Sequence, residues 1–181
     1  MFFWTGDGPA PASFQDSFED PLWVEIWNDV FMQFNREKDG SLTDLSQKNI
    51  DTGMGLERTI MVLNGKKSVY ETDAFTAILQ KIADITGVSI LDDPTEDSDN
   101  ANSVRIIADH LRASAVLLSD GILPSNTDQG YILRRLIRRA VRHGKKLGVS
   151  GSFCGEIAQI AIDQLSDQYK NLKINEVDIL K

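Results

Sequence analysis

Residues 49–58, with the sequence NIDTGMGLER, join a strand pattern to a helix pattern and decide the fold class. The strand pattern ends at Thr52, and the glycines at 53 and 55 then allow the backbone to turn sharply. Apolar residues recur at helical spacing over 56–64. The stretch therefore predicts a strand, a tight turn and a helix in immediate succession.

The same stretch has features of an anion-binding site. Gly53 and Gly55 allow a ligand to approach the backbone closely, and the first N–H groups of a helix carry partial positive charge. Arg58, in the first helical turn, adds a planar and permanently charged group that suits phosphate, while Asp51 suits an ammonium group. A second interpretation stays open, in which Arg58 forms only a surface ion pair.

Toward the N-terminus, residues 22–37 alternate between two faces that both carry apolar side chains, which predicts one long strand inside a sheet. Asp39-Gly40 predicts a hairpin turn, and the returning strand is expected over 42–45 and again over 49–52. Asn28 is unusual inside a strand; it is either buried and hydrogen-bonded or faces solvent.

Beyond residue 65 the strand patterns stop and amphipathic helix patterns follow. The acidic segment 92–102 has few apolar residues and is expected to be disordered. Because an isolated hairpin is unstable, the β-rich part is expected to belong to a larger antiparallel sheet, and the fold class is α+β. The remaining expected elements are a short strand and a loop in 1–21 and helices at 72–86, 103–120, 131–147, 152–169 and from 174 onward.

The charge of the chain is unevenly distributed. Its 181 residues carry a net charge of −8, which taken alone argues against a nucleic-acid partner. Residues 131–148, however, hold seven basic side chains and no acidic one, and on a helix these fall opposite the apolar positions. An all-basic face favours contact with phosphate, since a solvated face normally mixes signs; an acidic surface of the same protein is the alternative. The preceding loop, 124–130, carries short polar side chains suited to base edges.

Several classes of protein are excluded by composition. Hydrophobic residues make up 41% and charged residues 25%, as in ordinary globular proteins, and no apolar run approaches the ~20 residues of a membrane span. The single cysteine, Cys154, excludes an internal disulfide and fits a reducing compartment, so a cytoplasmic location is expected. His110 and His143 lie far from Cys154 in sequence, so no zinc site is expected.

Four stretches resemble the alanyl-tRNA synthetase family of class II synthetases. They are VEIWNDVFMQFN at 24–35, NIDTGMGLER at 49–58, VRIIADHLRAS at 104–114, and GILPSN at 121–126 followed by GYILRRLIRRAVRHG at 130–144. The resemblance implies that residues 1–66 are the C-terminal portion of the class II aminoacylation domain, comprising the long strand, the hairpin and the signature helix. It implies that residues 67–181 belong to a helical tRNA-recognition domain that is incomplete at its C-terminus.

The resemblance also implies a reaction in which ATP and alanine, with Mg²⁺, form alanyl-adenylate, and alanine then passes to its tRNA. The glycine–arginine segment resembles the third class II signature, so Arg58 and Gly55 are expected to hold ATP, with Arg58 on its γ-phosphate. Asp51 is expected to bind the amino group of alanine. Glu25 is expected to contact ATP or Mg²⁺, although strand alternation places it on the opposite face from Asn28. The other implied contacts are Asn28, Ile26 and Gly53 around alanine, and Asn126, Asp128, Arg134, Arg135, Arg138, Arg139, Arg142 and Lys145 on the acceptor stem of tRNA(Ala), which carries a G·U pair.

Other parts of the family pattern have no counterpart in this sequence: the first two class II signatures, the zinc-containing editing domain and the C-terminal oligomerising region. We therefore expect a segment of a longer synthetase that does not activate alanine by itself but still binds tRNA, with the remainder of the synthetase chain as a partner. The alternative is a stand-alone module that binds the acceptor stem without catalysis. The upstream sequence of the gene distinguishes the two, because only the enzyme requires the other signatures.

Overall fold

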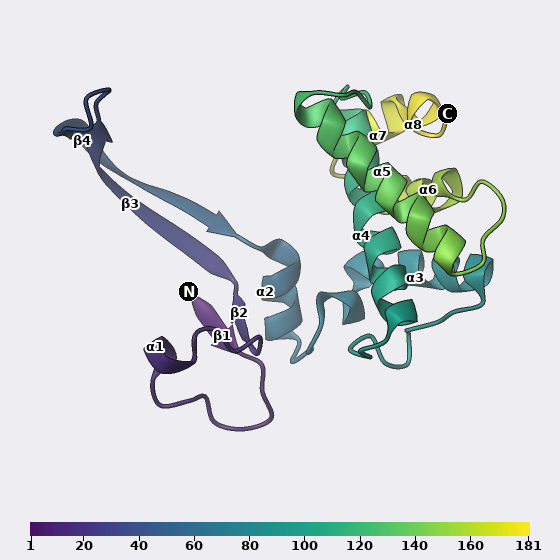
Figure 1. Cartoon of the computed structure of the whole chain (residues 1–181), viewed down its shortest axis with the longest axis horizontal. Coiled ribbons are helices and arrows are strands. Elements are labelled where there is room, and N and C mark those ends of the chain that lie inside the picture. Colours follow the sequence, from purple (N-terminus) through teal and green to yellow (C-terminus); the bar gives the residue numbers. More distant parts are fainter. The chain divides into compact units, whose positions relative to one another are not determined.

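The computed structural model describes all 181 residues and divides them into two compact units, Met1–Val69 and Tyr70–Lys181. Unit 1 holds every strand and two short helices, whereas unit 2 is helical (Figure 1). A 3-10 turn, η1 (Val69–Glu71), spans the boundary. The predicted α+β composition is therefore confirmed. No helix combines the length and the apolar character needed to cross a membrane.

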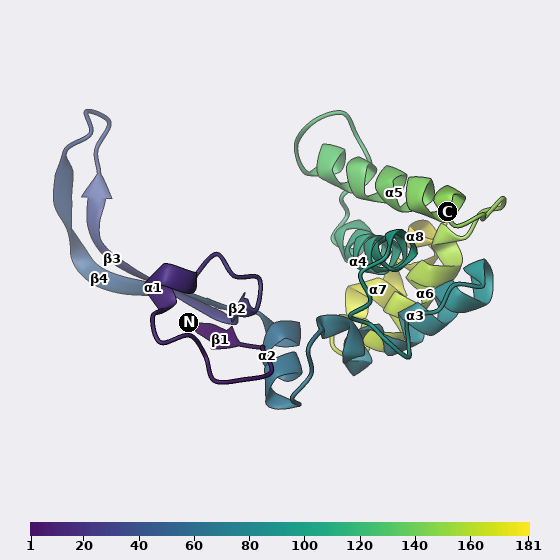
Figure 2. The ribbon, with the colours of Figure 1, turned by 60° about the horizontal axis from the view of Figure 1, so that its bottom comes forward.

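Unit 1 contains two separate antiparallel sheets of two strands each. The first pairs β1 with β2 and the second pairs β3 with β4, which form a long curved ribbon that extends beyond the rest of this unit (Figure 2). The elements are β1 (Phe2–Trp4), α1 (Phe14–Ser17), β2 (Trp23–Glu25), β3 (Trp27–Arg36), β4 (Leu42–Met54) and α2 (Leu56–Leu63).

The strand predicted over 22–37 is interrupted at Ile26, so the prediction of one continuous strand is wrong. The Ile26 N–H donates to the carbonyl oxygen of Met1 at 3.0 Å, while the Ile26 carbonyl accepts from the N–H of Gly55, also at 3.0 Å. Its two backbone groups thus bond toward different sheets. The alternation of side chains continues through this position, so the pattern could not show the change of partner.

Two further differences in unit 1 have local causes. The returning strand is continuous from Leu42 to Met54, although the sequence predicts a gap at 46–48; polar residues do not interrupt it because its faces are open to solvent. A register irregularity lies between Met32 and Phe34 of the partner strand. The predicted loop contains α1, whose start is capped by Ser13 Oγ, which accepts from the N–H of Asp16 at 3.3 Å.

The hairpin of β3 and β4 has no buried residue on either face. Phe31 is 78% exposed, and Asn28 faces solvent, which was one of the two options for that residue. Unit 1 contains a small aromatic cluster, in which the ring of Trp23 contacts those of Trp4 and Phe14. Among the apolar side chains of this unit, Met61 alone is buried.

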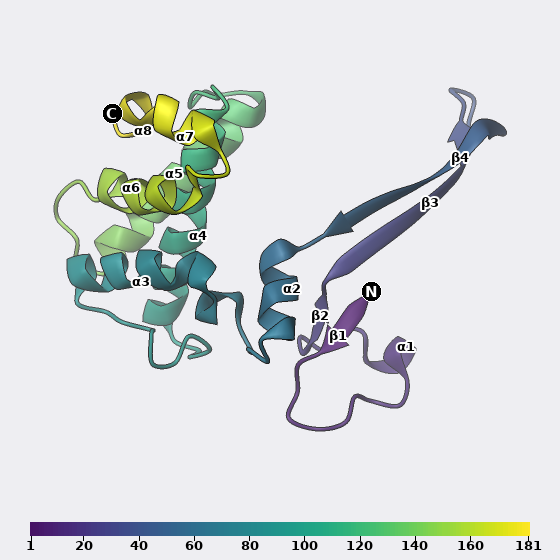
Figure 3. The ribbon, with the colours of Figure 1, turned by 180° about the vertical axis from the view of Figure 1, so that it is seen from behind.

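Unit 2 is a bundle around α4, which contacts every other α-helix of the unit (Figure 3). Its largest fully buried side chains come from five of the helices and include Ile78, Ile107, Leu133, Ile157 and Leu172. The helices are α3 (Asp73–Thr86), α4 (Asp99–Ser119), α5 (Asp128–Lys146), α6 (Cys154–Leu165), α7 (Lys170–Ile174) and α8 (Glu176–Ile179).

The helices of unit 2 follow the predicted order with shifted ends. The predicted caps of α3 are confirmed, with Thr72 at its start and Gly87 in the left-handed conformation (φ 72°) at its end. Helix α4 begins at Asp99 because Ser98 Oγ accepts from the N–H of Ala101 at 3.1 Å, so residues 99–102 are helical and that part of the disorder prediction is wrong. Helix α6 is shorter than the predicted 152–169.

Candidate functional sites

The register of the hairpin places three of the predicted alanine-binding residues on one face. Asn28 pairs with Gly53, and Val30 pairs with Asp51; directly opposed residues share a face. Asn28, Asp51 and Gly53 are therefore neighbours across the two strands. A Cβ built at Gly53 would have no atom within 4 Å, so the glycine leaves open space beside the Asn28 amide.

Glu25 lies beside Asn28, which corrects the prediction that the two occupy opposite faces. The Asn28 Nδ2 donates to Glu25 Oε1 at 3.1 Å. The reason is the interruption at Ile26, which removes the strict alternation between residues 25 and 28. The carboxylate of Glu25 thus joins the same group of side chains as Asn28.

Arg58, in the first turn of α2, is held by the same segment. Its Nη1 donates to the backbone carbonyl of Glu25 at 2.9 Å, and it forms no ion pair with a carboxylate, so the surface ion pair considered above is absent. A Cβ at Gly55 would lie 3.3 Å from Arg58 Cδ, so a larger residue at 55 would crowd the Arg58 side chain where it crosses the turn. One bond uses one of five guanidinium donors, and the others can reach an anion.

The opposite face of the hairpin carries a hydrogen-bonded chain that was not predicted. Trp27 Nε1 donates to Thr52 Oγ1, which in turn donates to Asp29 Oδ1 at 2.9 Å. These residues come from paired positions of β3 and β4 next to the candidate site. The period-2 spacing of Trp27 and Asp29 is the sequence signal that could have suggested this arrangement.

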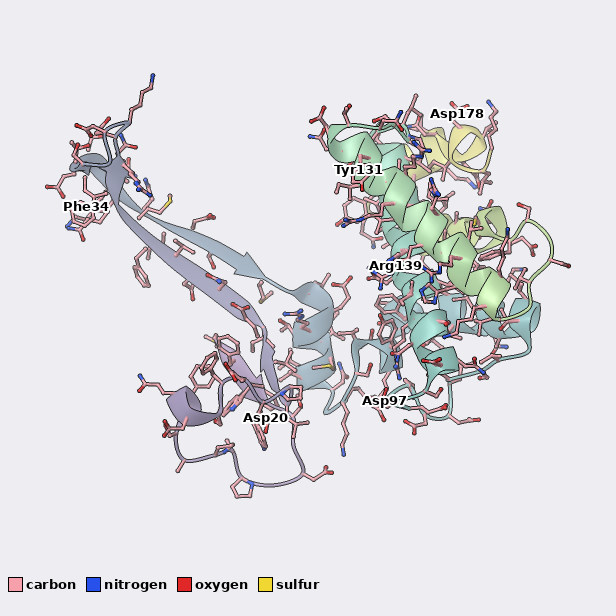
Figure 4. All side chains as sticks on the ribbon, viewed as in Figure 1. Asp20, Phe34, Asp97, Tyr131, Arg139 and Asp178 are labelled. Atoms are coloured by element: carbon pink, nitrogen blue, oxygen red, sulfur yellow. The ribbon has the colours of Figure 1, made fainter.

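In unit 2, α5 presents its arginines to solvent. Leu133, Ala140 and Gly144 are buried on the inner side, whereas Arg139, labelled in Figure 4, is exposed. Among the seven basic residues only Lys146 forms an ion pair, with Asp99 at 3.0 Å. Six cations therefore stay without a carboxylate partner in this chain, which leaves little support for the alternative of an acidic surface of the same chain. They are Arg134, Arg135, Arg138, Arg139, Arg142 and Lys145.

The loop before α5 folds tightly onto the start of the helix. The N–H of Ser125 donates to the Gly130 carbonyl at 3.0 Å, and a Cβ at Gly130 would lie 2.5 Å from the carbonyl oxygen of Leu123. The loop thus requires glycine at 130. It leaves Asn126 exposed, with its Oδ1 accepting from Arg134 Nη1, so the structure brings these two predicted residues together. Asp128 is also exposed and has a positive φ of 50°.

His143 connects α5 to α4. Its Nδ1 lies 3.0 Å from Ser103 Oγ, and that hydroxyl donates to the carbonyl of Asp99 at 2.8 Å. Since the hydroxyl proton is used, the hydroxyl accepts and the proton is on Nδ1 of the imidazole. Burial and then the charges of Arg139, Lys146, Arg142 and His110 lower the pKa of His143 below its usual value.

No three His, Cys, Asp or Glu side chains lie close enough together to hold a metal ion. Burial raises the pKa of the Cys154 thiol, which keeps it protonated. The Mg²⁺ that the sequence resemblance implies would need few protein ligands, because phosphate oxygens and water supply most of the coordination of such an ion. Glu25 and Asp51 are the two carboxylates gathered near Asn28, and Glu25, the predicted Mg²⁺ contact, could contribute one such ligand.

The chain is similar to proteins of one known family. The family described as class II tRNA synthetases (A) matches residues 6–181, and the chain belongs to this family. Among its relatives, the alanine–tRNA ligase of Treponema denticola is 52% identical over 99% of this chain and 30% of that protein. The alanine–tRNA ligases of Pseudoalteromonas translucida and Treponema pallidum are each 43% identical, over 93% and 96% of the chain.

The chain spans only 18–30% of the length of these curated relatives. The resemblance drawn from the four sequence stretches is thereby confirmed, as is the expectation that the chain corresponds to a part of the relatives rather than their whole length.

Proposed function

We propose that this chain is part of an enzyme that attaches alanine to its tRNA through alanyl-adenylate at the expense of ATP. The observation that carries the proposal is the group at the base of the hairpin: Asn28, Asp51 and Gly53 on one face, with Glu25 bonded to Asn28 and Arg58 anchored on the Glu25 carbonyl. An open space flanked by an amide and a carboxylate suits a small amino acid, and a nearby guanidinium suits a triphosphate.

Each residue of the hairpin group has a role in this proposal. Asp51 binds the ammonium group of alanine, while Asn28 and the backbone at Ile26 and Gly53 limit the size of the pocket. Arg58 binds the γ-phosphate of ATP and offsets negative charge as pyrophosphate leaves, and the turn at Gly55 lets the phosphates approach the backbone. Glu25 contacts ATP or Mg²⁺, which supplies charge neutralisation when bound.

We further propose that residues 1–66 complete a catalytic sheet and that 67–181 contact the acceptor stem of the tRNA. The six unpaired cations of α5 contact phosphates, while Asn126 and Asp128, in the loop and first turn, lie toward the base edges. Exposure of all eight side chains and the lack of carboxylate partners support this assignment.

The isolated chain is expected to bind tRNA without activating alanine. Adenylate formation requires a site that excludes water, whereas every residue of the hairpin from Trp27 to Met54 is at least partly exposed. The test is to measure ATP–pyrophosphate exchange and tRNA binding with the same preparation. Detectable exchange would contradict the expected inactivity.

A set of variants tests the basic face. Replacing Arg134, Arg138 and Arg142 by alanine is expected to weaken tRNA binding by about tenfold or more at low salt and to reduce the log–log salt slope by about 2 to 3. The control removes three exposed lysines elsewhere in unit 2, Lys170, Lys173 and Lys181, and should leave the affinity nearly unchanged. Equal effects of the two triple variants would reduce the proposal to non-specific attraction.

A binding module without catalysis is the second candidate, and the buried core of unit 2 supports it because a helical unit with its own core can act alone. To distinguish the candidates, the upstream reading frame that carries the other two class II signatures is fused to this chain, and ATP–pyrophosphate exchange is measured. Recovery of alanine-dependent exchange favours the enzyme, and an upstream frame that lacks those signatures favours the module.

A further inference from the structure

One aromatic side chain of α5 lies on its outer, basic side. Tyr131 is 47% exposed in the first turns of the helix (Figure 4). Helical spacing brings Arg134 and Arg135, three and four residues on, to its two sides, and Arg138 lies one turn further. These four residues line a shallow pocket of about 230 Å³.

Packing within unit 2 does not account for this tyrosine. The residues of α5 that pack against the other helices are on its inner side, where Leu133 and Ala140 are fully buried. The ring of Tyr131 stacks on no other aromatic ring. The three arginines around it have no carboxylate partner, and Arg134 bonds instead to the neutral amide of Asn126. The pocket therefore combines an accessible aromatic face with three unpaired positive charges.

We propose that this pocket binds an unpaired nucleotide of an RNA, next to a duplex stem that lies along the rest of α5. The base stacks on the ring of Tyr131, and Arg134, Arg135 and Arg138 bind the phosphates on either side of it. An aromatic ring among arginines suits a nucleotide that has left the stack, because a base inside a duplex has both faces covered by its neighbours, whereas an unpaired base can offer a face to the ring. A duplex alone would need the arginines but not the ring.

This inference rests on the proposed function of α5 in binding RNA and adds a single-stranded specificity to it. It predicts that an RNA hairpin with a single-stranded extension of about four nucleotides binds more tightly than the same hairpin with a blunt end, by about tenfold or more. Stacking is sequence-tolerant, so extensions of different sequence should bind with similar affinity.

The test compares the two hairpins on the full chain and on variants. Tyr131→Leu keeps an apolar side chain that a helix tolerates but removes the ring, and it should abolish the advantage of the extension. Tyr131→Phe keeps the ring and should retain the advantage. The matched control is Tyr169→Leu, at an exposed tyrosine of the same unit (59% exposed), and should behave as the unchanged chain. Far-UV circular dichroism verifies that each variant is folded.

The outcomes separate the inference from the proposed function. If the unchanged chain binds both hairpins equally, or if Tyr131→Leu retains the advantage, the inference is overturned while RNA binding by α5 stands. If the chain binds neither hairpin, both are overturned. Displacement of the extension by free AMP, with blunt-hairpin binding unaffected, supports the pocket. Tyr131-dependent binding of AMP without any effect of the extension would assign the pocket to a free mononucleotide and overturn the RNA ligand.

Discussion

The two units of this chain differ in how they are stabilised. In unit 1, the candidate site lies on the two-stranded hairpin of β3 and β4, and both faces of this hairpin are open to solvent. Met61 is the one buried apolar side chain of the unit. In unit 2, the basic residues lie on the outer side of α5, and the inner side of this helix packs into the apolar core. The basic helix is therefore supported by local apolar packing, whereas no apolar core within unit 1 supports the hairpin face.

The elements of the two sites reflect this difference. The hairpin group is held by hydrogen bonds between neighbours in the ladder, such as those of Asn28 and Arg58 to Glu25, which water can replace. The basic face is held by the burial of Leu133 and Ala140 against other helices. Burial of apolar area contributes about 25 cal/mol per Å², so unit 2 has the larger source of stability.

The largest expected contrast concerns hydrogen exchange. Core amides of α4 should exchange only through global unfolding of unit 2, at a cost of about 5–15 kcal/mol, whereas amides of β3 and β4 should exchange with an opening free energy near zero. Two-stranded hairpins without a covered face are marginally stable, which is the physical reason. Exchange followed by mass spectrometry or NMR measures both in one sample. Equal protection of α4 and of the β3–β4 hairpin would mean that the two regions do not differ in local stability.

The second prediction compares how the truncation of a buried isoleucine and of an exposed isoleucine changes the free energy of unfolding. Ile107→Ala removes a fully buried side chain from α4 and should lower the free energy of unfolding by about 2–5 kcal/mol. Ile50→Ala removes the same atoms from β4, where the side chain is 58% exposed, and should change it by no more than about 0.5 kcal/mol. Urea titration followed by circular dichroism gives both values. A large effect at Ile50 would mean that the hairpin face is covered in solution.

A third prediction concerns a glycine inside α5. A Cβ at Gly144 would lie 2.5 Å from Cε1 of Phe153, so Gly144→Ala should force this ring aside and destabilise unit 2 by about 1–3 kcal/mol. The control is Gly155→Ala in α6, where the nearest atom is the carbonyl oxygen of Leu180 at 3.6 Å. That substitution should be neutral or stabilise by up to about 1 kcal/mol. Thermal unfolding of the two variants side by side decides between them.

The smallest expected effect is the dependence of unit 2 on pH. The pKa of His143 is lowered from 6.5, first by burial and then by Arg139, so the unfolded chain binds this proton more readily than the folded one. The stabilisation from neutral His143 is complete above pH 6.5 and is lost as the pH falls toward and through the folded pKa. Unfolding midpoints measured on both sides of pH 6.5 should show the decline, and His143→Gln should flatten it. A midpoint that rises on acidification would reverse the assigned sign.

The order of elements could be predicted because local signals coincide with the periodicity. Thr72 and Gly87 bound α3 as predicted, and the helix after Gly55 begins at Leu56. The errors occur where a single backbone or side-chain bond decides the outcome. Ile26 bonds toward two sheets, and the cap at Ser98 lets α4 begin at Asp99, four residues before the predicted start at 103. Neither bond alters the apolar pattern from which elements are predicted.

In the candidate sites, too, residue spacing predicted some of the neighbours correctly and missed those that depend on individual hydrogen bonds. Asn28, Asp51 and Gly53 were predicted as one group, and the register between β3 and β4 places them on one face. Glu25 was placed on the wrong face because alternation was extended through Ile26. Tyr131 was not singled out, although its spacing from Arg134, Arg135 and Arg138 is that of one helix face; its exposure is what the structure adds.

The sequence by itself determined the family, the succession of strands and helices, and the separation of an acidic body from one basic helix, because these depend on residue order and on spacing along one element. Only the tertiary structure decided that Glu25 joins Asn28, that Arg58 bonds to a backbone carbonyl, and that six cations of α5 stay unpaired. The physical reason is that hydrogen bonds and ion pairs form between segments distant in the chain, and their partners are chosen by packing and register rather than by local pattern.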